Sequence, residues 1–388
     1  MAAANALKDY ILSKLPDSKV FIYDFLEYIS PFINKAVTGG YVYMAKNTPL
    51  MYGSFYKSAD KAYTITNTAV ELTTSLLENK LNPLLEESKP DIVITTHAFG
   101  AEIVSGLKNK GLINIPIISI VTDFAVHQSY ISSGIDAYIV STDDMIGQFM
   151  TRGVEMKKIY PFGIPVKQAF YKNIDRETAF AEEGLDPDIP TILIMAGSFG
   201  VTDILKIYHK IVNSKADFQV IVITGKNEKL YDTFEKYLRK IAMANTLINF
   251  RGLSKPKPEL YISKHIKKSK PTKLLYYTNE VEKYMHMADL IVTKPGGLTI
   301  TEAIASNLPM AVFNAIPGQE IQNADFLTGH NMAIKIDKNN LCTKQITELL
   351  NSPEKLERMK DAIAAFSKGN SAAKIYDLML KLVDEYSE

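Results

Sequence analysis

Short apolar stretches rich in β-branched residues alternate along the chain with longer stretches whose apolar positions recur at helical spacing. Buried apolar strands that alternate with helices are typical of parallel sheets covered by helices on both faces. The pattern therefore predicts an α/β protein. Strands are expected at Lys19–Asp24, Asp91–Thr95, Pro116–Val121, Asp136–Val140, Thr191–Ala196, Phe218–Thr224, Leu247–Phe250, Asp289–Thr293, Met310–Phe313 and Met332–Ile336. Helices are expected between most of them, including Asn67–Glu87, Ala98–Lys110, Thr202–Ser214 and Glu228–Ala242.

A stretch rich in proline and glycine, Tyr160–Val166, divides the chain. Such residues interrupt regular elements, strand–helix units lie on both sides of it, and 388 residues suffice for two domains. We predict Rossmann-like domains at 1–163 and 164–370, and a C-terminal helix at 371–388 that packs back on the first domain. Ligands of such sheets bind beyond the carboxyl ends of the strands, so a site is expected in the loops that follow strands.

The clearest such loop follows the strand Asp289–Thr293. It is a tight turn made by Lys294, Pro295, Gly296 and Gly297, and a helix begins near Leu298. Glycines let a ligand approach the backbone, and the free N–H groups of a helix start attract phosphate. Thr299 and Glu302 share one face of that helix, and a carboxylate there can accept hydrogen bonds from the two hydroxyls of a ribose. An ordinary strand–helix turn explains the same pattern.

Three further loops follow strands of the same half. After Met310–Phe313, a helix begins with polar residues that suit sugar hydroxyls, although capping explains them equally: Gly318, Gln319, Glu320 and Asn323. After Thr191–Ala196 come residues that could cradle a diphosphate: Gly197, Ser198, Phe199 and Gly200. After Phe218–Thr224 come Gly225, Lys226 and Asn227. No complete dinucleotide fingerprint or Walker loop is present. Four such loops together favour a nucleotide-type ligand more than any one alone.

The stretch Thr293–Asn323 is similar to the donor site of the UDP-sugar-dependent lipid glycosyltransferases of the glycosyltransferase 28 type. That family includes processive diacylglycerol β-glucosyltransferases, plant monogalactosyldiacylglycerol synthases and, more distantly, the enzyme that adds N-acetylglucosamine to lipid I. The similarity runs from residue 2 to about residue 350. It implies a GT-B fold, in which two Rossmann-like domains with parallel sheets face a cleft and the second domain holds the nucleotide sugar.

The resemblance also implies roles for the loop residues. Glu302 would hold the ribose, while Gly296, Gly297 and Thr299 would face the phosphates. The donor sugar would lie against Gln319, Glu320 and Asn323. The nucleotide pocket would be completed by Ser198, Phe199 and Gly200, with Gly252 near the uracil. Enzymes of this kind resemble inverting catalysts that use no metal or other cofactor, so helix ends and Lys or Arg would meet the phosphate charge.

Two segments of the first half also resemble the family. Asp91–Phe99 resembles its strand that ends in Thr-His-Pro-Phe, with Ala98 in place of the proline, and Val121–His127 resembles its Thr-Asp-Phe-x-x-His element. An inverting transfer needs a general base for the proton of the acceptor hydroxyl. The candidates are His97, Asp123 and His127, and for each of them a capping role in a loop is the competing interpretation.

The N-terminus departs from the family pattern. Family members begin with a strand and a glycine-rich loop that ends in Gly-His, then a helix. Here Met1–Leu7 resembles that helix, and the strand and the histidine loop do not precede it. Either the start is internal, or the protein lacks a central strand and a catalytic loop. On the second interpretation we expect a weakened first domain and low activity, because unpaired buried backbone groups cost about 1–3 kcal/mol each.

Charge and composition limit the classes of binding partner that the chain is expected to have. The net charge of +1 gives no overall footprint for nucleic acid. The stretch Leu253–Lys273 carries seven lysines and one glutamate, a local charge of +6, which favours either a solvated loop or attraction to anionic lipid. The aromatic stretch Tyr41–Tyr63 could dock at a membrane interface or lie buried. A single cysteine, Cys342, fits a reducing compartment, and no apolar run is long enough to span a membrane.

These observations favour one function. The chain is expected to be a bacterial enzyme that transfers a hexose, glucose first of all, from a UDP-sugar to diacylglycerol or a glycosyl-diacylglycerol. It would work in the cytoplasm, peripherally on the inner face of the cell membrane. Two alternatives stay open: a polyprenol-linked acceptor, or an inactive UDP-sugar-binding protein that lacks the histidine loop.

Overall fold

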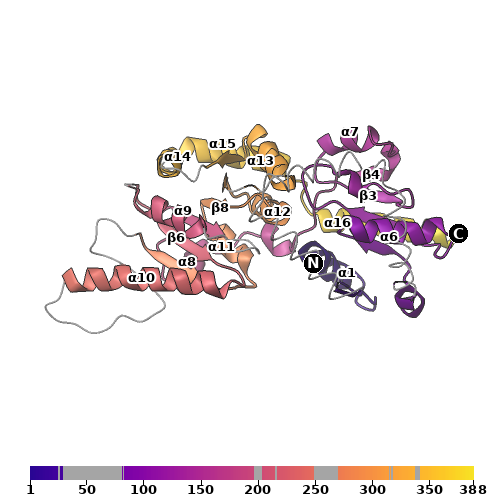
Figure 1. The fold of residues 1–388 in the computed structure, drawn as a ribbon, viewed down its shortest axis with the longest axis horizontal. Helices are drawn as coiled ribbons and strands as arrows, with labels where there is room; N and C mark the ends of the chain where they lie inside the picture. Colours follow the sequence, from indigo (N-terminus) through magenta and orange to yellow (C-terminus); the bar gives the residue numbers. More distant parts are fainter. Residues whose placement is uncertain are drawn as a thin grey trace. The chain divides into compact units, whose positions relative to one another are not determined.

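The structure is a computed structural model that describes residues 1–24, 27–28, 81, 83–195, 203–214, 216–248, 270–313, 315, 318–336 and 341–388. The chain forms two compact units (Figure 1). The first unit comprises Met1–Gln168, Ile316–Asn323 and Lys368–Glu388. The second comprises Ala169–Ala315 and Ala324–Ser367. Each unit is built on its own parallel sheet.

The first unit contains a parallel sheet of four strands in the order β1-β2-β3-β4. These are β1 (Val93–Thr95), β2 (Ile117–Ile120), β3 (Ala137–Ile139) and β4 (Ile159–Tyr160). Its helices are α1 (Ala2–Lys14), α6 (Ala98–Asn109), η1 (Gln128–Tyr130), α7 (Asp144–Met150), η2 (Met156–Lys158) and α16 (Ser371–Ser387), and η3 (Gln168–Tyr171) follows where the second unit begins. Among the described residues no strand precedes β1.

The two faces of this sheet are covered by different helices, because successive strand residues point to opposite sides. On one face, Ile117 and Val121 pack with Ile103 and Leu107 of α6. The other face carries a second apolar cluster, formed by Ile118 and Ile120 of β2, Leu7 and Ile11 of α1, and Ile375 and Leu378 of α16.

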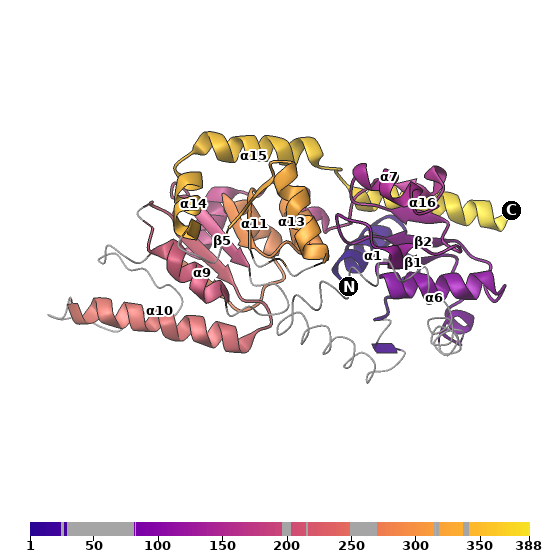
Figure 2. The same ribbon diagram turned by 45° about the horizontal axis from the view of Figure 1, so that its top comes forward.

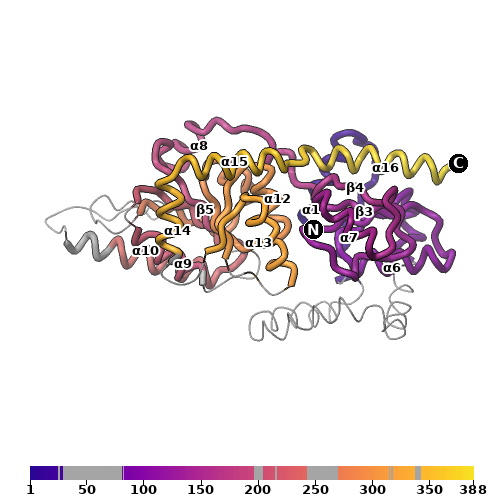
Figure 3. Tube along the Cα trace, turned by 90° about the horizontal axis from the view of Figure 1, so that it is seen from above, coloured from indigo at the N-terminus to yellow at the C-terminus, as the bar shows by residue number. Residues whose placement is uncertain are grey.

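Polar contacts fix both ends of α16, whose course along the first unit is traced in Figure 3. At its start, the Ser371 hydroxyl donates to the Gly163 carbonyl at 2.5 Å. Near its end, the Tyr386 hydroxyl donates to Oδ1 of Asp136 at 2.8 Å. Residues 368–388 are therefore part of the first unit although they end the chain.

The second unit contains a six-stranded parallel sheet in the order β10-β9-β8-β5-β6-β7. The strands are β5 (Thr191–Met195), β6 (Gln219–Ile223), β7 (Thr272–Leu275), β8 (Leu290–Thr293), β9 (Met310–Val312) and β10 (Ala333–Lys335). The helices are α8 (Arg176–Glu183), α9 (Asp203–Val212), α10 (Glu228–Ile248), α11 (Val281–Met287), α12 (Gly297–Ala305), α13 (Gln319–Gly329, which begins in the first unit), α14 (Leu341–Leu350) and α15 (Pro353–Phe366). Figure 2 shows α9 and α10 beside this sheet.

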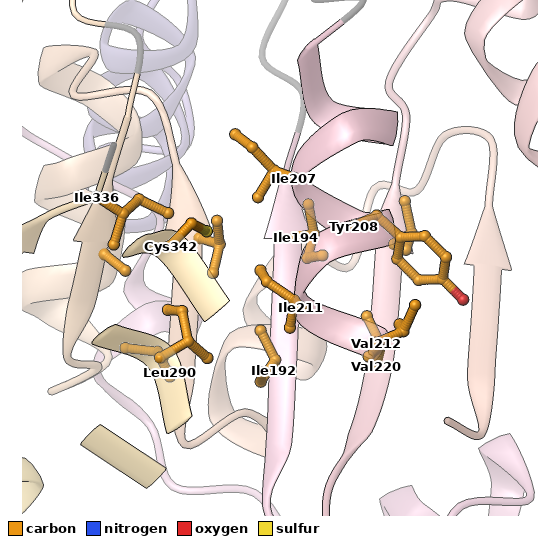
Figure 4. Close-up of a cluster of buried hydrophobic side chains, with 14 of the residues drawn as sticks. Ile192, Ile194, Ile207, Tyr208, Ile211, Val212, Val220, Leu290, Ile336 and Cys342 are labelled. Carbon is orange, nitrogen blue, oxygen red and sulfur yellow. The ribbon is translucent and has the colours of Figure 1, made fainter. Parts of the chain in front are cut away.

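The core of the second unit is apolar. Ile192 and Ile194 of β5 lie against Ile207 and Ile211 of α9, as Figure 4 shows, and Cys342 of α14 packs into the same cluster. All of these side chains are buried. Burying a Leu, Ile or Val side chain contributes about 1.5–3 kcal/mol, so this cluster holds the loops at the strand ends in place.

Two predicted strands are wrong. Lys19–Asp24 forms no strand with any described residue, and the side chains of Phe21 and Tyr23 are 56% and 46% exposed rather than packed into a core. Leu247 and Ile248 of the predicted strand Leu247–Phe250 belong to α10, because the helical apolar pattern of that segment continues through them. The strand that pairs with β6 is instead β7, whose first residues lie at the end of the lysine-rich stretch. Of the predicted helix Asn67–Glu87, the described residues 83–87 are helical and most of the rest lies outside the described residues.

Candidate functional site

The turn between β8 and α12 leaves a helix start with open space beside it. The Gly296 N–H donates to the Lys294 carbonyl at 2.9 Å, and Gly296 precedes the first residue of α12 without a side-chain cap. A Cβ added to Gly296 would meet no atom within 4 Å. Because the first N–H groups of a helix lack intrahelical acceptors and carry partial positive charge, this turn can receive an anionic group.

The first turns of α12 separate a buried face from an accessible one. Ile300, Thr301 and Ala303 are buried, and the Thr301 hydroxyl donates to the Gly297 carbonyl at 2.7 Å. Thr299 and Glu302 are half-buried, as is Lys294, whereas Pro295 and Gly297 are buried. Thr299 and Glu302 therefore retain access to solvent close to the open helix start.

At the end of β6 the three candidate residues have different surroundings. Gly225 adopts φ +65°, a conformation that favours glycine. The side chain of Asn227 caps α10, since its Oδ1 accepts the Leu230 N–H at 3.1 Å. Lys226 is exposed, and its ammonium lies 5.2 Å from the centre of the Tyr277 ring. The capping interpretation therefore describes Asn227, while Lys226 offers a positive charge at the same sheet edge.

The loop that leads into α13 positions a buried amide. Gly318 adopts φ +114°, and Gln319 and Glu320 are half-buried at the start of the helix. Asn323 is fully buried in the first unit. Its Nδ2 donates to Oδ1 of Asp123 at 3.2 Å, and its Oδ1 accepts the Phe124 N–H at 2.9 Å. The amide that the sequence assigned to the donor sugar thus contacts a candidate general base.

Asp123 lies just beyond the end of β2 and is held by several neighbours. Burial raises the pKa of its carboxyl to about 6, with the Asn323 hydrogen bond opposing the rise and the charge of Glu320 adding to it. The Ser141 hydroxyl donates to the Asp123 carbonyl at 2.7 Å. Burial and the charge of Asp123 also raise the pKa of the Tyr130 hydroxyl, which is hydrogen-bonded to Thr122. A carboxylate with such a pKa is ionised at neutral pH and is a stronger base than an ordinary one.

The two candidate histidines begin helices. Nδ1 of His97 accepts the Phe99 N–H at 3.3 Å at the start of α6. More than a third of His97 is accessible to solvent. Neighbouring groups nevertheless displace water from its imidazole, which lowers its pKa, while the charge of Asp24 acts to raise it. Nδ1 of His127, a buried residue, lies 2.8 Å from the Ser129 hydroxyl and accepts the Ser129 N–H at 3.2 Å. Both rings are therefore used in capping.

The other predicted site residues are Gly197, Ser198, Phe199, Gly200 and Gly252, which lie outside the described residues, as do Tyr41–Tyr63 and residues 253–269. Sequence reasoning missed the roles of Ser141, Tyr130 and Thr122 around Asp123. It also missed the pairing of Asn323 with Asp123, because residues 200 positions apart share no local signal. Within the part of the chain that the structure describes, no cluster of three His, Cys, Asp or Glu residues is arranged for a metal, and no helix is long and apolar enough to cross a bilayer.

Comparison with known proteins places both halves of the chain among related sequences. A monogalactosyldiacylglycerol (MGDG) synthase family model matches residues 1–166, and the glycosyltransferase family 28 C-terminal domain model matches residues 191–378. A processive diacylglycerol beta-glucosyltransferase of Staphylococcus epidermidis is 30% identical over 311 residues, which cover 80% of this chain and 72% of that protein.

Two solved structures share the fold. MurG of Acinetobacter baumannii is 13% identical to this chain, and the superposition has a TM-score of 0.52. The match covers 80% of this chain and 79% of the MurG chain. UDP-GlcNAc 2-epimerase of Neisseria meningitidis, bound to UDP-GlcNAc, is 16% identical, covers 81% and 82% of the two chains, and gives a TM-score of 0.56. At these identities the likeness is one of architecture.

Proposed function

Because the chain belongs to the family of the processive diacylglycerol β-glucosyltransferases, we propose that it transfers glucose from UDP-glucose to diacylglycerol or a glycosyl-diacylglycerol, with inversion at the anomeric carbon. Its fold is GT-B, as the sequence predicted, with an α/β unit around each parallel sheet. The observation that carries the proposal is the 30% identity over 311 residues to an enzyme of that name.

The donor half of the reaction is assigned to the second unit and to the start of α13. We propose that the uncapped start of α12 at Gly296 receives the diphosphate, and that Glu302 accepts hydrogen bonds from the ribose hydroxyls. The open space beside Gly296 and the solvent access of Glu302 support these roles. Gln319 and Glu320, half-buried at the start of α13, would contact the glucose hydroxyls.

The acceptor half is assigned to Asp123. In the proposed step the acceptor hydroxyl attacks the anomeric carbon and gives its proton to the Asp123 carboxylate. The carbon–oxygen bond to UDP breaks, and the negative charge that develops on UDP is stabilised at the start of α12. The raised pKa of Asp123, about 6, supports its choice over His97, whose Nδ1 is already used in capping.

A lipid acceptor requires access to a membrane surface, and we propose that the protein binds peripherally to the cytoplasmic face of the membrane. Phe21, Tyr23 and Tyr28 are exposed and form a ring cluster, with centroid distances of 6.4 Å between the first two and 5.8 Å between the last two. Aromatic side chains of this kind favour the membrane–water interface. Residues 253–269 and Tyr41–Tyr63, the other surfaces proposed for anionic lipid, lie outside the described residues.

The proposal is tested by incubating the purified chain with radiolabelled UDP-glucose and vesicles that contain diacylglycerol, then extracting the lipids. Label in a glycosyl-diacylglycerol is expected. Label found only with a polyprenol-linked acceptor would favour the first alternative. Binding of UDP-glucose without transfer to either acceptor would favour the inactive binding protein.

A further inference from the structure

One side chain holds both the carboxylate and the backbone at the proposed general base. The Asn323 amide donates to Oδ1 of Asp123 at 3.2 Å and accepts from the backbone N–H of the next residue, Phe124, at 2.9 Å. An amide offers a donor and an acceptor on one rigid plane, so the pair of bonds fixes the direction of the Asp123 side chain relative to its own backbone. Neither a leucine nor an alanine at 323 could replace these bonds.

The same helix start also brings a negative charge toward Asp123. Glu320 precedes Asn323 by three residues on α13, and residues three apart lie on one face of a helix. The Glu320 charge acts on the Asp123 carboxyl and makes its proton harder to remove, whereas the Asn323 hydrogen bond makes it easier to remove. Two residues one turn apart on α13 therefore act on Asp123 in opposite directions.

Two further polar groups lie beside Asp123, a phenol and a hydroxyl. From η1, the buried Tyr130 faces it with a phenol that is hydrogen-bonded to Thr122, and burial keeps that phenol protonated. From the loop after β3, the Ser141 hydroxyl donates to the Asp123 carbonyl rather than to its carboxylate. Of these groups, Glu320 is the one that carries a charge.

We propose that Asn323 is the positioning residue for the Asp123 carboxylate, and that Glu320, one turn earlier on the same helix, is the charged residue that acts on this carboxylate. This inference rests on the proposed function, in which Asp123 takes the acceptor proton. Gln319 and Glu320 are also the residues assigned to the donor glucose, so the helix start that contacts the donor carries the residues that set the base. A donor hydroxyl that donates to Glu320 would reduce the effect of its charge on Asp123.

The experiment measures the pH dependence of kcat/KM for glucose transfer to diacylglycerol in wild type, Asn323→Ala, Glu320→Gln and the control Gln322→Ala, whose side chain is exposed on the same helix. The acidic limb of the wild-type profile is expected near pH 6, the pKa of Asp123. Asn323→Ala should move it up by about one pH unit, because a hydrogen bond to a charged group is lost, and should lower kcat at least about tenfold through misorientation. Glu320→Gln should move the limb down, and Gln322→Ala should leave it in place.

Calorimetric titration with UDP accompanies each profile, because a purely structural effect of α13 would weaken UDP binding without moving the limb. If Asn323→Ala does not fold, Glu320→Gln decides the matter alone, since its side chain is only half-buried. An unmoved limb in both variants would overturn the inference. The variant Asp123→Asn separates this failure from that of the proposed base. Full transfer by Asp123→Asn refutes the base itself, whereas loss of transfer with unmoved limbs in the other variants refutes only the roles of Asn323 and Glu320.

Discussion

The side-chain amide of Asn323 donates to Oδ1 of Asp123 at 3.2 Å, although the two residues stand 200 positions apart. Each was singled out in the sequence for a different partner, Asn323 for the donor sugar and Asp123 for the acceptor proton. The structure joins them in the first unit, because this unit takes in residues 316–323. The hydrogen bond links a residue of the donor motif to the candidate base.

Replacing the base should slow transfer strongly while leaving donor binding intact. Asp123→Asn keeps the shape of the side chain but removes its ability to take a proton, and general bases contribute roughly 10²–10⁴-fold to rate. We expect kcat for glucose transfer to fall by about that factor, with an unchanged calorimetric affinity for UDP. Asp143→Asn is the matched control, since Asp143 follows the neighbouring strand β3, is exposed and pairs with Lys368. Equal losses in both variants would contradict a specific role for Asp123.

The same variant should change how stability depends on pH. Burial raises the pKa of Asp123 from its ordinary value of 3.8 to about 6, so the folded protein favours the protonated carboxyl. The stability contributed by that proton is fully present below pH 3.8 and is lost as the pH rises through about 6. Asp123→Asn cannot ionise and escapes this loss, which is about 1–2 kcal/mol after allowance for partial exposure.

Urea denaturation at a series of pH values measures this difference. As the pH rises from about 4, Asp123→Asn should gain stability relative to wild type, and the gain should level off above about pH 7. A gap between the two proteins that stays constant over this range would mean that Asp123 titrates with an ordinary pKa.

The open helix start of α12 can be tested with a single methyl group. Gly296 has a negative φ, and an added Cβ would meet no atom within 4 Å, so Gly296→Ala should fold as stably as wild type. If the diphosphate lies against this backbone, the methyl group will weaken UDP binding by about tenfold or more, or roughly 1.4 kcal/mol. Gly147→Ala, in the exposed interior of α7 and with equally open space, should stabilise its helix by up to about 1 kcal/mol and leave UDP binding unchanged. Unchanged UDP affinity in Gly296→Ala would mean that the phosphates do not bind at the start of α12.

Glu302 should hold the ribose of the donor. Hydrogen bonds to a charged group contribute about 1.5–3 kcal/mol, so Glu302→Ala should weaken UDP binding roughly 10–100-fold. Glu354→Ala, on the exposed surface of α15 in the same unit, is the control. A further comparison uses UDP that lacks the hydroxyls of its ribose. If Glu302 binds these hydroxyls, this ligand should bind wild type and Glu302→Ala almost equally. A full loss of affinity for that ligand too would show that Glu302 acts on another part of UDP.

Local pattern was enough to predict most of the fold. Strands such as Phe218–Thr224 and Asp289–Thr293 are short apolar runs followed by loop residues, and both were confirmed as β6 and β8. The pattern failed where neighbours decide the outcome. Lys19–Asp24 has strand-like residues but no pairing partner among the described residues, and Leu247–Ile248 continues a helix whose apolar spacing does not end at Ala242. β7 was missed because lysines surround it and because its strand character comes from pairing with β6.

Some parts of the candidate site could be predicted from local sequence pattern, and others could not. Loops after strands, such as Lys294–Gly297, were recognisable because parallel sheets place them at one edge. The surroundings of Asp123 were not recognisable, because Asn323, Ser141 and Tyr130 reach it through tertiary packing. Its raised pKa is likewise a property of burial and of the Glu320 charge rather than of the Thr-Asp-Phe motif.

Metal dependence follows from the proposed mechanism. The start of α12 and nearby lysines are expected to meet the phosphate charge in place of a divalent cation. Transfer should therefore keep its rate when EDTA is added to the purified protein. Loss of transfer with EDTA, reversed by Mg²⁺ or Mn²⁺, would require a cation in the donor site.

The anomeric configuration of the product tests the central claim most directly. UDP-glucose carries an α linkage, and attack of a lipid hydroxyl on the face opposite UDP inverts it. The ¹H NMR spectrum of the glycolipid made from UDP-glucose and dioleoylglycerol should therefore show the large H1–H2 coupling of a β-glucoside, and Asp123→Asn should form this glycolipid roughly 10²–10⁴-fold more slowly. A product with the small coupling of an α-glucoside, or release of free glucose with no glycolipid, would contradict inverting transfer to diacylglycerol.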